Sequence, residues 1–234
     1  MRPLLRLKGV EAGYGPARVL NGVSFDVGVG EVVALMGRNG MGKTTLVRSI
    51  LGLAPWVRGR VLFETRELRG QPTYRIARAG IGLVPEGRQT FPNLTVRENL
   101  TATASPGRSG KDPWTVERVL AMFPQLAARM RAMANTLSGG AQQMLAIGRA
   151  LMTNPALLIL DEATEGLSPA LRQEIWACLA TLQARGQSIL LIDKHVAPIR
   201  RIADRIVILE KGRVAWRGTA EGLTDDVLDR TLGV

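Results

Sequence analysis

Apolar and polar residues alternate along two segments near the start of the chain. These segments cover residues 5–10 and 19–29, and the turn-forming sequence Gly13-Tyr14-Gly15-Pro16 lies between them. Alternation with a period of two is typical of a strand with one buried face, and glycine and proline favour turns. The pattern therefore predicts an antiparallel pair of strands at the beginning of the protein.

Three shorter runs, residues 31–36, 156–160 and 188–192, are apolar almost throughout and predict buried strands. A segment with helical periodicity, residues 169–185, separates the last two runs, and the order strand, helix, strand implies parallel pairing. The segment 203–214 predicts a closing hairpin. The sequence thus indicates an α/β fold with a mainly parallel sheet and an N-terminal antiparallel β part.

The stretch from about residue 93 to residue 150 shows only helical periodicity, interrupted by a glycine-rich break at Ser138-Gly139-Gly140. We expect a single domain over residues 1–234, with this stretch forming a helical subdomain inserted into the core. No apolar run approaches the roughly 18 residues that a membrane-spanning helix needs, and the N-terminus has no signal-peptide pattern. Any membrane association is therefore expected to be peripheral or through a partner.

The composition is that of a folded protein with an excess of positive charge. Hydrophobic residues make up 46% and charged residues 22% of the chain, and the formal net charge is +11. This charge favours anionic partners, which include nucleotides, nucleic acid, lipid headgroups and acidic protein surfaces. The one cysteine, Cys178, cannot form an intramolecular disulfide and lies in a helical apolar pattern, so we expect a core residue in a reducing cytosol.

A glycine-rich loop follows the strand at 31–36 and precedes a segment, 46–53, with helical periodicity. Its sequence, Gly37-Arg38-Asn39-Gly40-Met41-Gly42-Lys43-Thr44, matches the P-loop pattern. Such a loop points backbone N–H groups at a phosphate, and the helix dipole adds to the attraction. The lysine reaches the β- and γ-phosphates, and the threonine hydroxyl binds Mg²⁺. The predicted ATP-binding residues of this loop are Gly37, Asn39, Gly40, Gly42, Lys43, Thr44 and Thr45.

Two carboxylates, Asp161 and Glu162, follow the apolar run at 156–160. Ligands of open α/β sheets bind at the carboxyl ends of the strands, so these acids are expected near the P-loop. In that place Asp161 would hold Mg²⁺ through water, and Glu162 would polarise the attacking water as general base. Adjacent acids after a strand are also common in turns, and the P-loop is what favours the catalytic interpretation.

The sequence Leu137-Ser138-Gly139-Gly140 precedes an apparent helix, whose N-terminus can bind a second anion. A P-loop, this Leu-Ser-Gly-Gly sequence and an apolar strand ending in Asp161-Glu162, in this order, resemble the nucleotide-binding domain of an ABC ATPase over essentially the whole chain. The resemblance implies a head-to-tail dimer in which ATP on one P-loop is capped by the partner's signature. The signature residues implied are Ser138, Gly139, Gly140 and Gln142. It also implies that Tyr14 stacks on adenine, although a tyrosine in a turn can equally be a packing residue.

Within that family the chain is similar to the shorter ATPase of branched-chain amino acid importers. The segments that carry this similarity are 84–88, 91–100, 161–167 and 232–233. The resemblance implies ATP and Mg²⁺ as cofactors, membrane-spanning permease subunits and a second ABC ATPase as partners, and a periplasmic or extracellular solute-binding protein that acts indirectly. It places the protein at the cytoplasmic face of the membrane, and a heterodimer in the cell is favoured over a homodimer. Importers for urea, short amides or other hydrophobic amino acids carry similar segments and remain alternatives.

The chain departs from the general family pattern at several positions. Glu86 stands where most members have a glutamine that contacts magnesium and water, and we count it with Thr44 and Asp161 among the predicted metal contacts. The switch histidine of the family comes 33 residues after Asp161, and that position is Lys194. We therefore predict that Lys194 senses the γ-phosphate and that His195, one place later, does not. Ala141 and Ser168 replace the usual Glu or Gln of the signature and the usual Asp of the loop after Glu162.

Two other classes of function remain open. A soluble ABC ATPase acting on nucleic acid or ribosomes would use the positive charge, but such relatives usually carry two cassettes or long coiled-coil insertions, which 234 residues do not hold. A module that binds ATP without hydrolysing it is disfavoured by Glu162 and Lys43 and kept open by Lys194. We predict no nucleic-acid partner, because a nucleotide site and a face near anionic lipid account for the charge.

Overall fold

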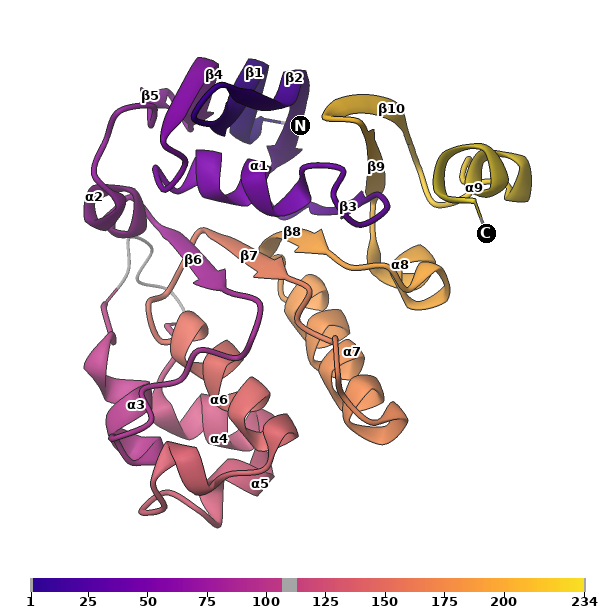
Figure 1. Ribbon diagram of the computed structural model, residues 1–234. Helices are drawn as coiled ribbons and strands as arrows, with labels where there is room; N and C mark the ends of the chain where they lie inside the picture. Colours follow the sequence, from indigo (N-terminus) through magenta and orange to yellow (C-terminus); the bar gives the residue numbers. More distant parts are fainter. Residues whose placement is uncertain (1, 107–112, 234) are drawn as a thin grey trace. The chain divides into compact units, whose positions relative to one another are not determined.

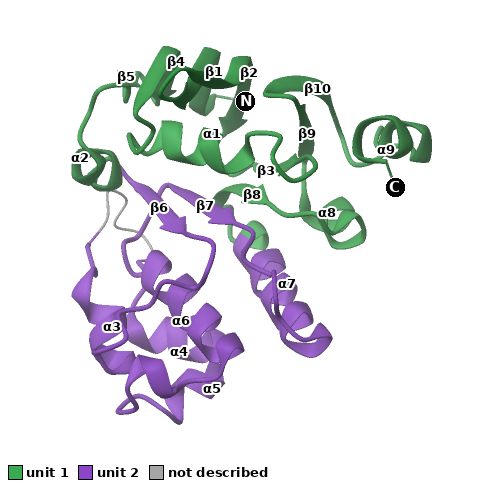
Figure 2. Cartoon of the chain, in the orientation of Figure 1, with its two compact units in different colours: residues 1–79, 183–234 green, residues 80–182 purple. Residues whose placement is uncertain are grey.

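The computed structural model describes residues 2–106 and 113–233 and divides into two compact units (Figure 2). Unit 1 comprises residues 1–79 and 183–234, and unit 2 comprises residues 80–182. Within the described residues, no helix has the length and apolar character needed to cross a bilayer.

The first sheet of unit 1 is antiparallel, with the strand order β2-β1-β4-β5 (Figure 1). β1 and β2 meet at a tight turn where Tyr14 lies opposite Ala17. The predicted N-terminal pair of strands is therefore confirmed. β1 extends further at both ends than the predicted 5–10, and β2 begins two residues before the predicted 19–29 and ends one residue before its end. The strands are β1 (Pro3–Tyr14), β2 (Ala17–Gly28), β4 (Trp56–Phe63) and β5 (Arg66–Glu67).

Four more strands of unit 1 follow the order β10-β9-β3-β8. β3 pairs in parallel with both β8 and β9, and β10 returns antiparallel along β9. Every residue of β3 and β8 is buried, as expected for parallel strands covered on both faces. The predicted buried strands and closing hairpin are confirmed. The strands are β3 (Val32–Met36), β8 (Ser188–Ile192), β9 (Arg205–Glu210) and β10 (Arg213–Gly218).

Helix α1 of unit 1 packs against the first sheet, where it contacts β1, β2 and β4 (Figure 1). It begins at Lys43, three residues before the segment that periodicity indicated, and ends at Ile50. Gly52, with a φ of +69°, provides the left-handed residue that commonly terminates a helix. The helices of unit 1 are α1 (Lys43–Ile50), α2 (Thr73–Arg78), α8 (Val196–Ile202) and α9 (Asp225–Leu232).

A buried carboxylate ties the two sheets of unit 1 together. Glu31 is 4% exposed and accepts hydrogen bonds from the backbone N–H of Gly28 and from the Arg205 guanidinium, whose Nη2 lies 3.0 Å from Oε2. Burial acts to raise the pKa of Glu31, but the hydrogen bonds from Arg205 and Gly28 outweigh it, and the pKa lies below its ordinary value. Glu31 therefore stabilises unit 1 as an anion.

We expect Arg205→Ala to lower the free energy of unfolding by about 1–2 kcal/mol near neutral pH, because a buried carboxylate loses a charged donor. The pKa of Glu31 is lower in the folded than in the unfolded state, so this contribution is present above the unfolded value and is lost as the pH falls through the folded value. Urea unfolding at about pH 7 and about pH 3 should show the difference from the parent narrowing in acid. Arg213→Ala, on the exposed strand β10, is the matched control, and a difference that is the same at both pH values would contradict this role.

Unit 2 contains the parallel strands β6 and β7 and most of the helices that the structure describes (Figure 2). In the described residues between 93 and 150, only helices and one isolated bridge, Thr95 to Met133, are present. Cys178 is 4% exposed in α7, and burial raises the pKa of its thiol to about 12, as befits a core residue. The elements are β6 (Ile81–Val84), β7 (Leu157–Asp161), α3 (Val96–Ala102), α4 (Val116–Met122), α5 (Pro124–Ala127), the short 3₁₀ helix at Ala134–Thr136, α6 (Gly139–Leu151) and α7 (Pro169–Ala184), whose last two residues fall in unit 1.

Candidate nucleotide site

The glycines of the predicted P-loop are required by the backbone of unit 1. Gly37 has a φ of +150°, and a Cβ there would lie 2.5 Å from the carbonyl oxygen of Leu209 on β9. Gly42 has a φ of +103°, and its Cβ would lie 2.8 Å from the side chain of Leu20 on β2. Gly40, with a φ of +79°, faces open space and is needed for its conformation alone. The loop therefore approaches two neighbouring strands more closely than any other residue type allows.

The tip of this loop is supported by the β9–β10 turn. The N–H of Gly212 donates to the carbonyl oxygen of Met41 at 3.2 Å, and the N–H of Lys211 lies 3.2 Å from the Met41 sulfur. Asn21 on β2 binds the same turn through the carbonyl oxygen of Lys211 at 3.0 Å. No sequence pattern indicated these supports, because the paired residues lie 170 to 190 positions apart along the chain.

Lys43 is the first residue of α1 and is only 6% exposed. Its Nζ donates to the carbonyl oxygens of Gly37 at 2.9 Å and Arg38 at 3.2 Å, so the ammonium lies over the loop. No side chain of the described residues caps α1 at Gly42, and its first turn holds no acidic residue. A helix N-terminus in this state, with an ammonium beside it, is chemically suited to a polyphosphate.

The other predicted nucleotide contacts lie in the same unit. Thr44 is half-buried and Thr45 buried in the first turn of α1, and Asn39 is exposed in the loop. Tyr14, at the end of β1, is 37% exposed, and its hydroxyl accepts a hydrogen bond from Arg48 of α1 at 3.2 Å. Tyr14 therefore lies beside the helix that follows the loop, with its ring partly open to solvent.

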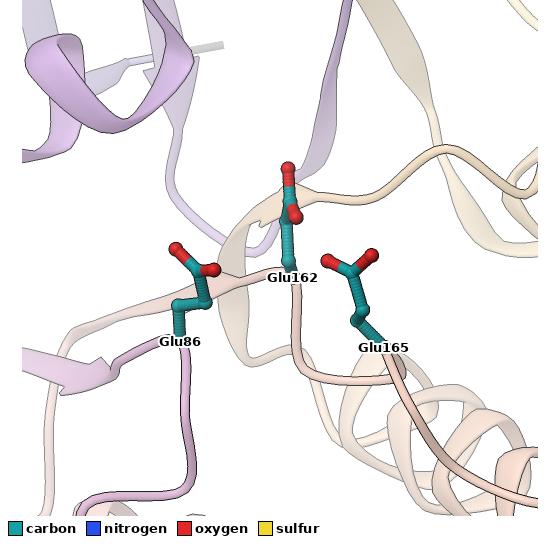
Figure 3. A group of neighbouring side chains, drawn as sticks. All are labelled: Glu86, Glu162 and Glu165. Atoms are coloured by element: carbon teal, nitrogen blue, oxygen red, sulfur yellow. The ribbon is translucent and has the colours of Figure 1, made fainter. Parts of the chain in front are cut away.

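Three glutamates gather at the carboxyl ends of β6 and β7 in unit 2 (Figure 3). One carboxylate oxygen from each of Glu86, Glu162 and Glu165 lies within 4.8 Å of the other two. The parallel register, with Val84 opposite Leu160, places Glu86 and Glu162 at the same edge. Sequence analysis counted Glu86 among the metal contacts and Glu162 as the general base, and it assigned no role to Glu165. A turn places Glu165 beside them, because its N–H donates to the carbonyl oxygen of Glu162 at 3.1 Å.

The backbone at Glu162 is unusual. Its φ is +51°, in the left-handed region that non-glycine residues rarely adopt. Asp161, one residue earlier, is the last residue of β7 and is 4% exposed. Carboxylate oxygens are the ligands that hard divalent cations prefer, so the donors at this edge suit Mg²⁺.

The signature residues form the N-terminus of α6. The Ser138 hydroxyl oxygen accepts the N–H of Ala141 at 3.4 Å, which caps the helix. A Cβ at Gly140 would lie 2.3 Å from the Leu171 side chain, so this first turn packs closely on α7. Gln142 does not face out from the first turn: its amide donates to the carbonyl oxygen of Ala134 at 3.1 Å.

The segment after β8 in unit 1 is organised by Asp193, a residue that sequence analysis did not single out. Asp193 is 2% exposed, and its Oδ1 accepts the N–H groups of Lys194 at 2.7 Å and His195 at 3.0 Å. The same oxygen lies 2.6 Å from Nδ1 of His195, so the imidazole is held by this carboxylate. Lys194 is exposed directly after the strand.

Comparison with known proteins assigns the chain to a class. The family model described as "ABC transporter" matches residues 20–165, and the chain belongs to this family. It is an ATPase subunit of the kind that binds and hydrolyses ATP and works with membrane permease components.

Among individual relatives, the chain is 40% identical, over 98% of its length and 100% of the other protein, to the high-affinity branched-chain amino acid transport ATP-binding protein BraG of Pseudomonas aeruginosa. It is 37% identical to the Nod factor export ATP-binding protein I of Rhizobium etli, over 94% of this chain and 68% of that protein. The crystal structure of the ADP conformation of MJ1267, an ATP-binding cassette of an ABC transporter, superposes with a TM-score of 0.82 at 28% identity, covering 100% of this chain and 98% of that one. The α/β fold predicted from the sequence is therefore confirmed.

Proposed function

We propose that the chain hydrolyses MgATP with the residues that the sequence singled out. Lys43 and the N-terminus of α1 bind the β- and γ-phosphates, and Thr44, Asp161 and Glu86 hold Mg²⁺, which neutralises phosphate charge. Glu162 orients and polarises the attacking water. The support is the uncapped N-terminus of α1 with the Lys43 ammonium beside it, and the carboxylates that unit 2 gathers at the ends of β6 and β7.

We further propose that two ATPase subunits share each nucleotide. The signature turn of one subunit, Ser138, Gly139 and Gly140, contacts the γ-phosphate held by the P-loop of the other. Gln142 stabilises that turn, because its amide donates to the carbonyl oxygen of Ala134. A second, longer ATPase completes the dimer in the cell. The protein acts at the cytoplasmic face of the membrane, bound to permease subunits and coupled through them to a solute-binding protein.

The transported substrate is proposed to be a branched-chain or other hydrophobic amino acid. One observation carries this: the match to BraG runs through the entire length of that protein, at 40% identity. The match to the Nod factor export protein leaves about a third of that protein uncovered. The alternative is that the chain serves a related importer whose substrate is urea or a short amide.

An uptake assay tests this proposal. The chain is reconstituted into vesicles with the permease subunits and the second ATPase that co-purify with it. The solute-binding protein is added outside, and uptake of labelled leucine is measured with ATP inside. We expect ATP-dependent uptake that unlabelled valine and isoleucine suppress and urea does not. The matched control carries Glu162→Gln, and uptake of labelled urea without leucine uptake would contradict the substrate assignment.

The proposal also assigns the switch position. We expect Lys194→Ala to slow ATP hydrolysis more than His195→Ala does, because the exposed ammonium can neutralise phosphate charge, while the His195 imidazole is engaged by buried Asp193. Lys194→Arg should be partly tolerated, since the charge persists in a different shape. Hydrolysis rates at saturating ATP decide the matter. An active Lys194→Ala variant beside an inactive His195→Ala variant would show that His195 holds the switch position.

A further inference from the structure

The loop that follows β6 has an unusual backbone at three consecutive residues. Gly87, Arg88 and Gln89 have φ values of +77°, +67° and +32°, and the N–H of Gln89 donates to the carbonyl oxygen of Gly87 at 2.7 Å. This hydrogen bond closes a three-residue turn centred on Arg88. Non-glycine residues adopt such a conformation only where the surroundings impose it.

The side of the loop that follows the turn is fixed to two helices of unit 2. Arg149 of α6 donates to the carbonyl oxygen of Gln89 at 2.5 Å, and its guanidinium lies 4.4 Å from the ring centroid of Phe91. Asn99 of α3, which is fully buried, accepts the N–H of Phe91 at 2.9 Å and donates to its carbonyl oxygen at 3.0 Å. The direction in which Arg88 leaves the turn is therefore set by the packing of the unit.

The Arg88 guanidinium lies against the first turn of α6. A Cβ at Gly139 would lie 2.2 Å from Nη1 of Arg88 and 2.6 Å from its Cζ, so the guanidinium occupies the place of a side chain at Gly139. A Cβ at Gly166, the residue after Glu165, would lie 3.8 Å from Nη2 of Arg88. One half-buried side chain thus reaches the signature turn and the loop that carries two of the three gathered glutamates.

The contact does not serve the helix electrostatically. A cation at a helix N-terminus opposes the helix dipole, and no acidic residue in the first turn of α6 offsets it. The contact links loops instead: Arg88 is two residues from Glu86, and its far end rests on Gly139. A displacement of the loop after β6 therefore has to move Arg88 relative to the signature turn.

We propose that Arg88 is a positioning residue that couples Glu86 to the signature turn at Gly139 and to the loop at Gly166. The inference rests on the proposed function, because it concerns how the predicted magnesium contact and the predicted trans contact move together. It also gives Gly139 a role of its own, because a Cβ at that residue would displace the guanidinium from the signature turn.

A double-mutant cycle on the chain in its transporter complex tests the coupling. We expect Arg88→Ala to lower kcat about 10-fold while the KM and the Kd for ATP stay within about 2-fold, since the P-loop is untouched. Gly139→Ala should also lower kcat, because it displaces the guanidinium and alters the proposed contact with the partner's γ-phosphate. If Arg88 acts through Gly139, the double variant should be no worse than Gly139→Ala alone. Arg88→Lys should restore kcat only in part, because lysine lacks the planar fork. Arg129→Ala, an exposed arginine of the same unit, is the matched control.

Hydrogen exchange of the nucleotide-free chain gives a second, independent measurement. Arg88→Ala should speed exchange of the amides at 139–141 and 165–167 and leave those of the P-loop unchanged. Additive losses of kcat, a parental kcat in Arg88→Ala, or unchanged exchange at 139–141 would each overturn the inference. If the parent hydrolyses ATP and Lys43→Ala does not, the proposed function stands whatever Arg88 does. If the unmodified chain binds no ATP, the proposed function is wrong.

Discussion

Glu162→Gln should bind ATP with the affinity of the parent and hydrolyse it at least ~100-fold more slowly. The amide keeps the shape of the side chain but cannot accept a proton from the attacking water. Since the γ-phosphate then persists, the two subunits remain closed on it. Phosphate release measures the rate, and size exclusion with ATP should show a dimer that the parent forms only transiently.

The matched control for this variant is Glu165→Gln. It removes one negative charge from the same group of carboxylates, whose oxygens lie within 4.8 Å of one another. Glu165, however, is exposed and lies at the end of the turn that begins at Glu162. We expect Glu165→Gln to retain most of the turnover. If both variants lose hydrolysis equally, the charge of the group rather than a base at Glu162 is responsible; unchanged turnover and a monomer in Glu162→Gln would remove Glu162 from catalysis.

The parts of the fold that the sequence predicted are those whose signal is local. β3 and β8 are almost uninterrupted apolar runs. The P-loop is recognised by the spacing of its glycines, which stand at positions whose φ values a side chain would not tolerate. Elements without such a signal were missed. β4 contains Gly59, which approaches the Gly9 carbonyl where the register shifts, and its outer half, Trp56 to Arg60, shows no alternation. α8 contains Pro198, which is tolerated only because it lies in the first turn.

The residues of the candidate site likewise fall into those that a sequence motif predicted and those whose place depends on the fold. Lys43 stands in a P-loop motif that points to phosphate chemistry by itself. Asp161 and Glu162 follow an apolar run, and the presence of the P-loop is what points them to magnesium and catalysis. Sequence analysis assigned no role to Asp193, Glu165 or Arg88. Their positions depend on a buried carboxylate, a turn and a strained backbone, which exist only once the chain is folded. Glu162 belongs to both groups. The sequence motif predicts its role, but its left-handed backbone is seen only in the folded chain.

Lys43→Ala should abolish tight ATP binding by the chain. Lys43 is 6% exposed and its ammonium donates to the carbonyl oxygens of Gly37 and Arg38, so in the parent it is already placed at the loop when the nucleotide arrives. Its removal takes away the side-chain cation that we propose for binding the β- and γ-phosphates, while the backbone N–H groups remain. Hydrogen bonds from charged donors are roughly twice as strong as neutral ones, and we expect the affinity to fall at least ~100-fold.

Calorimetry with ATP measures this loss, and Ser138→Arg is the matched control. That substitution adds a large side chain to the signature, where it should block closure onto the γ-phosphate of the partner, yet it leaves the P-loop of its own chain intact. Ser138→Arg should therefore bind ATP as the parent does and hydrolyse almost none. Equal ATP affinity in Lys43→Ala and the parent would refute the P-loop assignment, and loss of binding in Ser138→Arg would show that Ser138 contacts the nucleotide of its own subunit.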